Sequence, residues 1–411
     1  MTASKATADS APSMALVVFW LASGTFAIGC GEFAAMSLLP YFAADFGITE
    51  ASAGGAVSLY ALGVVIGAPT IAVFASRYPP KRVLVALMAL FAVGNGLSVV
   101  APTPLLLDVA RFIAGIPHGA YFGIAMLFAA DIAAPHRRSL AVSQVMMGIA
   151  ISNILGVPVV TAIGQALGWR AGFAVVAALA ALTMVMVQRV APALDADPAA
   201  HPLSELKALT NRDVLLTLSM GAVGFGGMFA VYSYFSAAYL ATTDAPEWTV
   251  SVALLAYGFG TTAGSALSGW VSGTKNLWAA LGFQIVLGVA AGIYAIAVGN
   301  PWAMGATMFI VGIGGGLVVP LQTRLMDVAG EAQTLAAAMN HAAFNVANAL
   351  GPWAAGMALE AGLGWSAPGW VGIGLAGGGL AMWGLMVLSD RARARASSVS
   401  EPLEPVLERA G

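Results

Sequence analysis

The sequence predicts an all-α membrane protein whose twelve transmembrane helices form two six-helix halves. Three observations lead to this prediction: only 9% of the 411 residues are charged, long apolar segments recur along the chain, and the second half repeats motifs of the first. Soluble domains carry about 25% charged residues. So few charges exclude a soluble enzyme and a disordered chain, and the net charge of −2 argues against a nucleic-acid partner.

Each apolar segment is long enough to cross a bilayer as a helix. A hydrocarbon core about 30 Å thick requires roughly 20 apolar residues in a helix, whereas a barrel would show short alternating segments. The predicted helices are 14–39, 54–75, 82–101, 105–130, 139–163, 170–190, 213–240, 249–272, 277–298, 302–324, 334–360 and 367–388.

One long polar connection separates the sixth and seventh helices. Its proline and charge content is typical of a linker, and both ends of the chain are expected to be unstructured. The predicted organisation is an N-terminal tail (1–13), a six-helix bundle (14–190), a linker (191–212), a second six-helix bundle (213–389) and a C-terminal tail (390–411).

The basic residues predict the orientation in the membrane. Of the 17 Lys and Arg residues, all but two fall on one side; Arg170 falls on the other, and Arg111 lies inside a helix. Loops rich in Lys and Arg face the cytoplasm. The sequence therefore predicts a multi-pass protein of the cell (inner or plasma) membrane with both termini and the linker in the cytoplasm.

Short motifs recur at corresponding places in the two halves. Phe112–Ile116 in the fourth helix matches Phe309–Ile313 in the tenth, and Asn153–Gly156 in the fifth matches Asn348–Gly351 in the eleventh. Two parallel repeats around a central site are typical of secondary transporters. The alternative is a structural duplication with no role in transport.

Two ionisable side chains lie deep inside predicted helices. A charge at mid-membrane costs roughly 2.5–3.5 kcal/mol on insertion scales, so it requires a functional or structural reason. At 1.5 Å per residue, Glu32 and Arg111 both lie roughly 9–11 Å below the outer surface, and they meet if their helices are neighbours. Glu32 is the candidate proton carrier, with Arg111 and Asp108 as coupling residues. A static Glu32–Arg111 pair is the alternative, and Asp108 lies near enough to the surface to be merely solvated.

Further polar and aromatic residues are candidates for substrate binding. Histidine can change charge near neutral pH, amides in a helix interior should face inward, and aromatic side chains can form an apolar pocket. For each of them ordinary packing or hydrogen bonding between helices is the alternative. These candidates are His118, Asn153, Tyr232, Tyr234, Asn340, His341, Phe344, Asn345 and Asn348. The four histidines are scattered and the single cysteine has no partner, so the sequence predicts no metal site and no cofactor.

The motifs resemble those of the major facilitator superfamily, and within it the arabinose-efflux-permease-like group of the drug:proton antiporter branch. Gly31–Phe33 followed by Leu38–Pro40 resembles the signature of the first helix, and Arg111–Ala120 resembles the motif of the fourth helix, whose arginine is implicated in proton coupling. The stretch 148–164 resembles the antiporter motif, which implies that Gly156 and Pro158 bend the helix and seal the outer side. Residues 340–351 resemble the eleventh helix of that group.

Two stretches depart from the family pattern. In the loop after the second helix, Ser76 stands where an acid is usual and Pro79 where glycine is usual, although Arg77 and Arg82 remain as gate candidates. In the antiporter motif, Val157 separates the glycine from the proline, and Val160 stands where glycine is common. The resemblance therefore implies the fold more firmly than it implies a charge latch or the direction of transport.

The sequence predicts a monomeric transporter that exports a small organic molecule in exchange for protons by alternating access. Its expected partners are the substrate, protons and the lipid bilayer, with no nucleic acid. A facilitator or importer of sugars or nucleosides is the alternative within the same class. A membrane enzyme or receptor is the alternative of a different class, but no catalytic set and no extramembrane domain is visible in the sequence.

Overall fold

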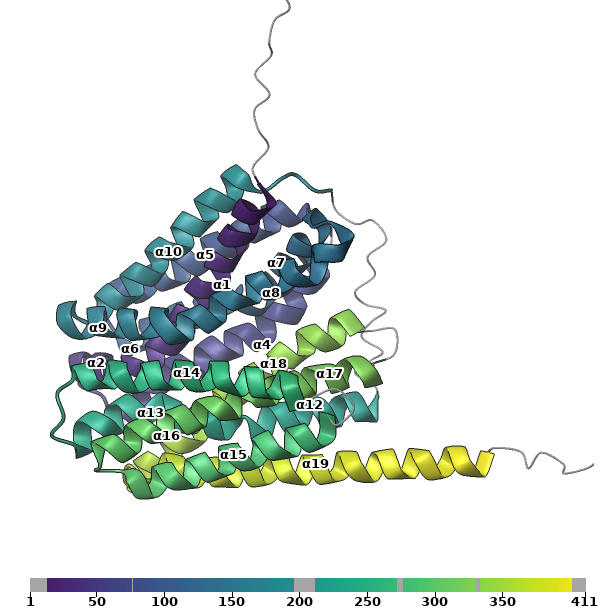
Figure 1. Ribbon diagram of the computed structural model, residues 1–411. Coiled ribbons are helices and arrows are strands. Elements are labelled where there is room, and N and C mark those ends of the chain that lie inside the picture. The colour runs from purple at the N-terminus through teal and green to yellow at the C-terminus, as the bar shows by residue number, and fades with distance from the viewer. Residues whose placement is uncertain (1–12, 76, 196–210, 272–275, 330–332, 401–411) are drawn as a thin grey trace, which may run out of the picture.

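The computed structural model describes residues 13–75, 77–195, 211–271, 276–329 and 333–400 (Figure 1). Within these ranges the secondary structure is helical throughout, which confirms the predicted fold class. The first half consists of α1 (Met14–Ser37), α2 (Leu39–Phe46), α3 (Glu50–Ala53), α4 (Gly55–Ala75), α5 (Pro80–Val100), α6 (Pro104–Gly115), α7 (His118–Ile132), η1 (Pro135–Arg137), α8 (Arg138–Ile151), η2 (Ser152–Gly156), α9 (Val157–Leu167) and α10 (Trp169–Val190). The second half consists of α12 (Arg212–Gly224), α13 (Gly226–Thr242), α14 (Trp248–Val271), α15 (Asn276–Ala297), α16 (Pro301–Gly314), η4 (Gly315–Leu317), α17 (Val318–Val328), α18 (Gln333–Glu360) and α19 (Ala367–Ser400).

Eleven helices or runs of helices among the described residues are long and apolar enough to cross a membrane. They correspond to eleven of the twelve predicted segments. The remaining segment, 334–360, is α18, a helix of 28 residues that packs against α12, α13 and α19 of its own half and against α4 of the other. Since α18 lies among the other helices, its asparagines and histidine have protein neighbours rather than lipid on that face.

The same helix pairs pack together in each half. In the first half α4 packs against α6 and α5 against α10; in the second, α14 packs against α16 and α15 against α19. Glycine permits the close approach in the first of these pairs. A Cβ atom on Gly115 would lie 2.0 Å from the carbonyl oxygen of Tyr60, and one on Gly312 would lie 2.4 Å from that of Tyr257. The recurrence predicted from the motifs therefore extends to the helix contacts.

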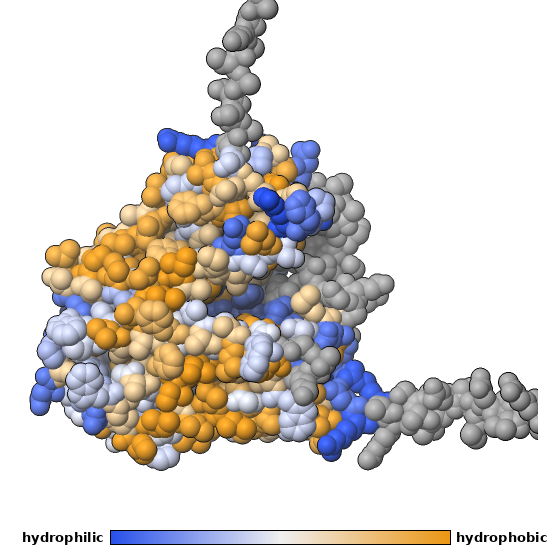
Figure 2. All heavy atoms as spheres, viewed as in Figure 1, coloured by the Kyte–Doolittle hydropathy of each residue, from blue (hydrophilic) through white to orange (hydrophobic). Residues whose placement is uncertain are grey.

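The two halves meet along a surface that we call the seam. The helices α1, α4, η2 and α9 of the first half face α13, α14 and α18 of the second. In Figure 1 the halves are close together near α2 and α9 and spread apart near α7 and α17, and Figure 2 shows a recess between them that is lined in part by hydrophilic side chains. At the close end, Gln165 donates to the backbone carbonyl of Glu247 at 3.0 Å, and the Tyr41 hydroxyl lies 3.4 Å from the Glu247 carboxylate. The close end is the side predicted to face outward.

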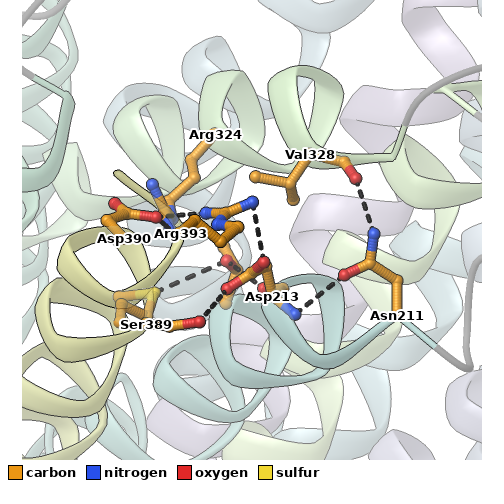
Figure 3. A network of polar contacts seen from close by, with 9 residues as sticks. Asn211, Asp213, Arg324, Val328, Ser389, Asp390 and Arg393 are labelled. Carbon is orange, nitrogen blue, oxygen red and sulfur yellow. Dashed lines mark hydrogen bonds and ion pairs between the residues drawn. The ribbon is translucent and has the colours of Figure 1, made fainter. Parts of the chain in front are cut away.

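A network of charges joins three helices at the opposite end of the second half (Figure 3). Asp213 at the start of α12 accepts from Ser389 at 2.7 Å and pairs with Arg393 at 2.8 Å, and Arg324 on α17 pairs with Asp390 at 3.0 Å. Arg393 also contacts Asp390. The helix α19 that carries Asp390 and Arg393 continues to Ser400. Residues 390–400 are therefore helical rather than part of an unstructured tail. Of the other predicted tail and linker residues, 1–12, 196–210 and 401–411 lie outside the described residues.

Candidate functional site

Glu32 lies in the seam and accepts a hydrogen bond from the opposite half. It is on α1 and only 5% of it is exposed. Asn348 on α18 donates from Nδ2 to Glu32 Oε1 at 2.8 Å. Because Asn348 belongs to the second half, this bond exists only while the two halves meet at this level. The predicted proton carrier is therefore in contact with both halves.

Arg111 lies beside Glu32 but bonds to other groups. It is fully buried on α6, where Nη2 donates to the carbonyl oxygen of Gly31 at 2.8 Å and Nη1 donates to Asn95 Oδ1 at 3.2 Å. Its guanidinium lies 4.4 Å from the centre of the Tyr60 ring. Stacking on an aromatic face stabilises a desolvated cation. The two hydrogen bonds and the ring together fix the position of the guanidinium.

The structure brings the two deep charges together without an ion pair between them. The residue that precedes Glu32 accepts from Arg111, as predicted if the first and fourth helices are neighbours. However, the four ion pairs found among the described residues do not include Glu32–Arg111. Asp108 is half-buried, and its carboxylate lies next to Gly55 at the start of α4.

A row of rings continues from Arg111 across the seam. The Tyr60 hydroxyl and His118 Nδ1 are 3.0 Å apart, which is a hydrogen bond between two buried side chains. His118 begins α7 after the break at Pro117, and its ring centre lies 5.2 Å from that of Phe122. Phe122 in turn stacks on His341 of α18, with ring centres 5.8 Å apart. Both candidate histidines are therefore next to the same phenylalanine, one from each half.

The asparagines of α18 differ in what they contact. Asn340 donates to Gln322 Oε1 on α17 at 2.8 Å, within the second half, whereas Asn345 donates to the backbone carbonyl of His341 at 3.0 Å. The amide oxygens of Asn345, Asn348 and, on η2, Asn153 are buried and have no hydrogen-bond partner. Among the described residues, the Nε–H of Arg111 and the amide oxygen of Asn340 are likewise buried and without a partner.

Of the aromatic candidates, Tyr232 lies in the seam beside α1. Its ring centre is 5.3 Å from that of Phe33 and 4.5 Å from that of Tyr257. The Tyr234 hydroxyl donates to the carbonyl oxygen of Pro352 at 3.1 Å and faces Gly54 of the first half, where a Cβ atom would lie 2.2 Å from it. Phe344 packs on Phe225 inside the second half at 4.7 Å. Phe33, the residue after Glu32, is thus covered by rings of the second half.

The gate candidates fall in two regions of the first half. Gly156 ends the π-helical turn η2, and a Cβ atom there would lie 2.3 Å from the sulfur of Cys30 on α1. Pro158 follows in the first turn of α9. Arg77 and Arg82 are both exposed beside the loop whose Ser76 lies outside the described residues. The structure has a π-helical turn at this position, and Gly156 allows α1 to come close.

The sequence analysis did not single out Tyr60 or Asn95. Tyr60 connects Arg111 to His118, and Asn95 accepts from Arg111. A signal for each was present: Tyr60 occupies the same place in the first half as Tyr257 in the second, and Asn95 is an amide inside an otherwise apolar segment.

The chain is similar to known membrane transport proteins over most of its length. Residues 21–340 match the family model of the Major Facilitator Superfamily. The chain is 35% identical over 347 residues to the inner membrane transport protein YdhP of Escherichia coli, which covers 84% of this chain and 89% of that protein. It is 29% identical to a chloramphenicol resistance protein of Streptomyces lividans, over 84% of this chain and 90% of that one. Among solved structures, the nucleoside transporter NupG superposes with a TM-score of 0.70 at 12% identity, covering 90% of this chain and 99% of that one.

Proposed function

Because the chain belongs to the major facilitator superfamily, we propose that it exports a small organic molecule across the inner membrane in exchange for protons. The family and the relatives are transporters, so the chain is a multi-pass membrane transporter and not an enzyme. Export is proposed because one relative is named for chloramphenicol resistance. Cytoplasmic termini are proposed from the distribution of basic residues.

The observation that supports proton coupling is the hydrogen bond from Asn348 to Glu32 across the seam, at 2.8 Å. A bond to an ionised carboxylate is roughly twice as strong as a bond between neutral groups. With neither proton nor substrate bound, this bond holds the two halves together at the level of Glu32. The empty transporter therefore does not change conformation.

Either of the two transported species releases this hold. A proton on Glu32 removes the charge and weakens the bond, whereas a substrate in the seam competes for Asn348. Because Arg111 bonds to Gly31 and Asn95, it stays in place through both steps and stabilises the carboxylate after the proton leaves. For exchange, the transporter must change conformation when either a proton or a substrate is bound, and it must not require both at once.

The test is transport of labelled chloramphenicol by purified protein in vesicles with an imposed pH gradient. We expect wild-type flux to follow the gradient and Glu32→Gln to lose this dependence, whereas Asp131→Asn, which changes an exposed acid on α7, should behave as wild type. Gradient-driven flux in Glu32→Gln at the wild-type rate would exclude Glu32 as the carrier. Wild-type flux that ignores the gradient would favour a proton-independent facilitator.

A single carrier also determines the charge moved in each cycle. With one proton exchanged for one neutral molecule, a net charge crosses the membrane, so transport should respond to membrane potential. Electroneutral exchange of a neutral substrate would contradict this stoichiometry.

A further inference from the structure

Among the described residues, three amide oxygens in the seam lack hydrogen-bond partners. They belong to Asn153, Asn345 and Asn348, whose residues are 8%, 5% and 0% exposed. The orientation of two of these amides is determined by their nitrogens, since Asn345 Nδ2 faces the carbonyl oxygen of His341 and Asn348 Nδ2 faces Glu32. Turning either amide over would place two acceptor atoms against each other. The free groups of Asn345 and Asn348 are therefore acceptors, and buried acceptors are normally paired.

These oxygens lie where the two halves face each other. His341, Asn345 and Asn348 are on one face of α18, because they are separated by four and then three positions. The His341 ring contacts Phe122 of the first half at one end of this face, and Asn348 contacts Glu32 at the other. Asn345 is between these two contacts. Asn153 is on η2, which packs against α14 across the seam.

The charges beside these oxygens offset each other. Glu32 and Arg111 are neighbours of opposite sign, and Arg111 already donates to Gly31 and Asn95. Arg111 keeps one buried N–H, on Nε, without a partner among the described residues, but Glu32 offsets its charge and an anionic ligand would meet three acceptor oxygens. A cationic ligand would find a carboxylate whose charge Arg111 offsets in turn. A neutral ligand that donates hydrogen bonds meets neither obstacle, and the rings of Phe122 and His341 provide a flat apolar surface.

We infer that the seam binds an uncharged solute with several hydroxyl or amide donors, which the free oxygens of Asn153, Asn345 and Asn348 accept. The inference rests on the proposed transport function and assigns the chemical class of its substrate.

Equilibrium binding to the purified full-length protein in detergent tests the inference. Without a membrane there is no proton gradient, so failure of binding and failure of proton coupling give separate results. The probes are chloramphenicol, L-arabinose and uridine as neutral donors, tetraphenylphosphonium as the cation and salicylate as the anion. We expect at least one neutral probe to bind, and the charged probes not to compete with it.

Two substitutions and a control connect binding to the amide oxygens. Asn345→Leu should weaken binding of the neutral probe about 3- to 10-fold, the value of one hydrogen bond, and Asn345→Asp, which keeps acceptor atoms, should restore much of it. Gln284→Leu removes an equally buried amide that bonds to Gly224 and Ala376 within the second half, so it should leave binding unchanged. Thermal unfolding of each variant identifies any that fails to fold.

Three results would overturn the inference. They are binding of a charged probe in preference to every neutral one, binding of none of the five probes, and equal affinity in Asn345→Leu and wild type. The second result would mean that water alone satisfies these oxygens.

Discussion

Replacing Asn348 by leucine removes its hydrogen bond to Glu32 across the seam while keeping a side chain of similar size. The bond length of 2.8 Å is that of a charge-assisted hydrogen bond. A bond to a charged group contributes about 1.5–3 kcal/mol, which corresponds to roughly a 10- to 100-fold change in an equilibrium constant. We expect the population in which the halves separate at the close end of the seam to rise by this factor.

A cysteine at position 51 would measure this population. Ala51 lies at the close end, where its carbonyl oxygen would be 3.4 Å from a Cβ atom on Gly356 of α18. The chain has one native cysteine, Cys30, so Cys30→Ala gives a background in which only Ala51→Cys reacts. A membrane-impermeant maleimide added from outside should label Asn348→Leu faster than the parent, in proportion to the open population.

Two comparisons decide whether the reasoning holds. Gln284→Leu, a change of the same kind inside the second half, should label at the parental rate. Glu32→Gln should label faster, because the neutral side chain forms a weaker bond with Asn348. If Asn348→Leu labels no faster than the parent, the Glu32–Asn348 bond does not hold the seam closed.

Three further predictions concern neighbouring groups. Arg111→Lys should reduce pH-gradient-driven chloramphenicol flux at least about tenfold, because one ammonium cannot reproduce a guanidinium fork that reaches both Gly31 and Asn95; wild-type flux would show that any cation suffices. The Arg170 hydrogen bond, and then that from Trp169, lowers the pKa of Asp45, a residue outside the membrane spans. A lowered pKa adds stability that is fully present above the unfolded pKa of about 3.9 and is lost as the pH falls through the folded pKa. The melting temperatures of wild type and Asp45→Asn should therefore differ by a constant amount from about pH 5 to 8 and converge in stronger acid. A difference that grows toward acid would contradict this sign. Gly115→Val should destabilise the fold by at least about 1–3 kcal/mol, because the valine side chain would collide with the backbone of α4 at Tyr60. Melting curves test this prediction, with Gly123→Val, whose surroundings are open, as the control.

The sequence predicted the depth of the charged residues but not their direction around each helix. Counting residues from the helix ends predicted that Glu32 and Arg111 meet if their helices are neighbours, and in the structure Arg111 donates to the residue before Glu32. It could not show that the guanidinium points to the carbonyl of Gly31, because that depends on how α1 and α6 are rotated about their axes. The partner of Glu32 was a candidate for another reason, since Asn348 is an amide on a polar face of its helix.

Residues whose importance comes from contact across the chain were the hardest to predict. Tyr60 is an ordinary aromatic in an apolar helix until the fold places it between Arg111 and His118. Tyr234 and Phe344 were candidates on their residue type; the structure shows Tyr234 donating to the backbone of Pro352 and Phe344 packing on Phe225. Their position on the helix, rather than their chemistry, determines what they contact.

The charge network of α12, α17 and α19 has a practical consequence for measurements of motion. Asp213, Arg324, Asp390 and Arg393 connect three helices of the second half to each other, through contacts that do not involve the first half. Spectroscopic labels on these helices should therefore keep constant distances from one another during transport. The second half can then provide the fixed reference frame against which the displacement of every helix in the first half is measured.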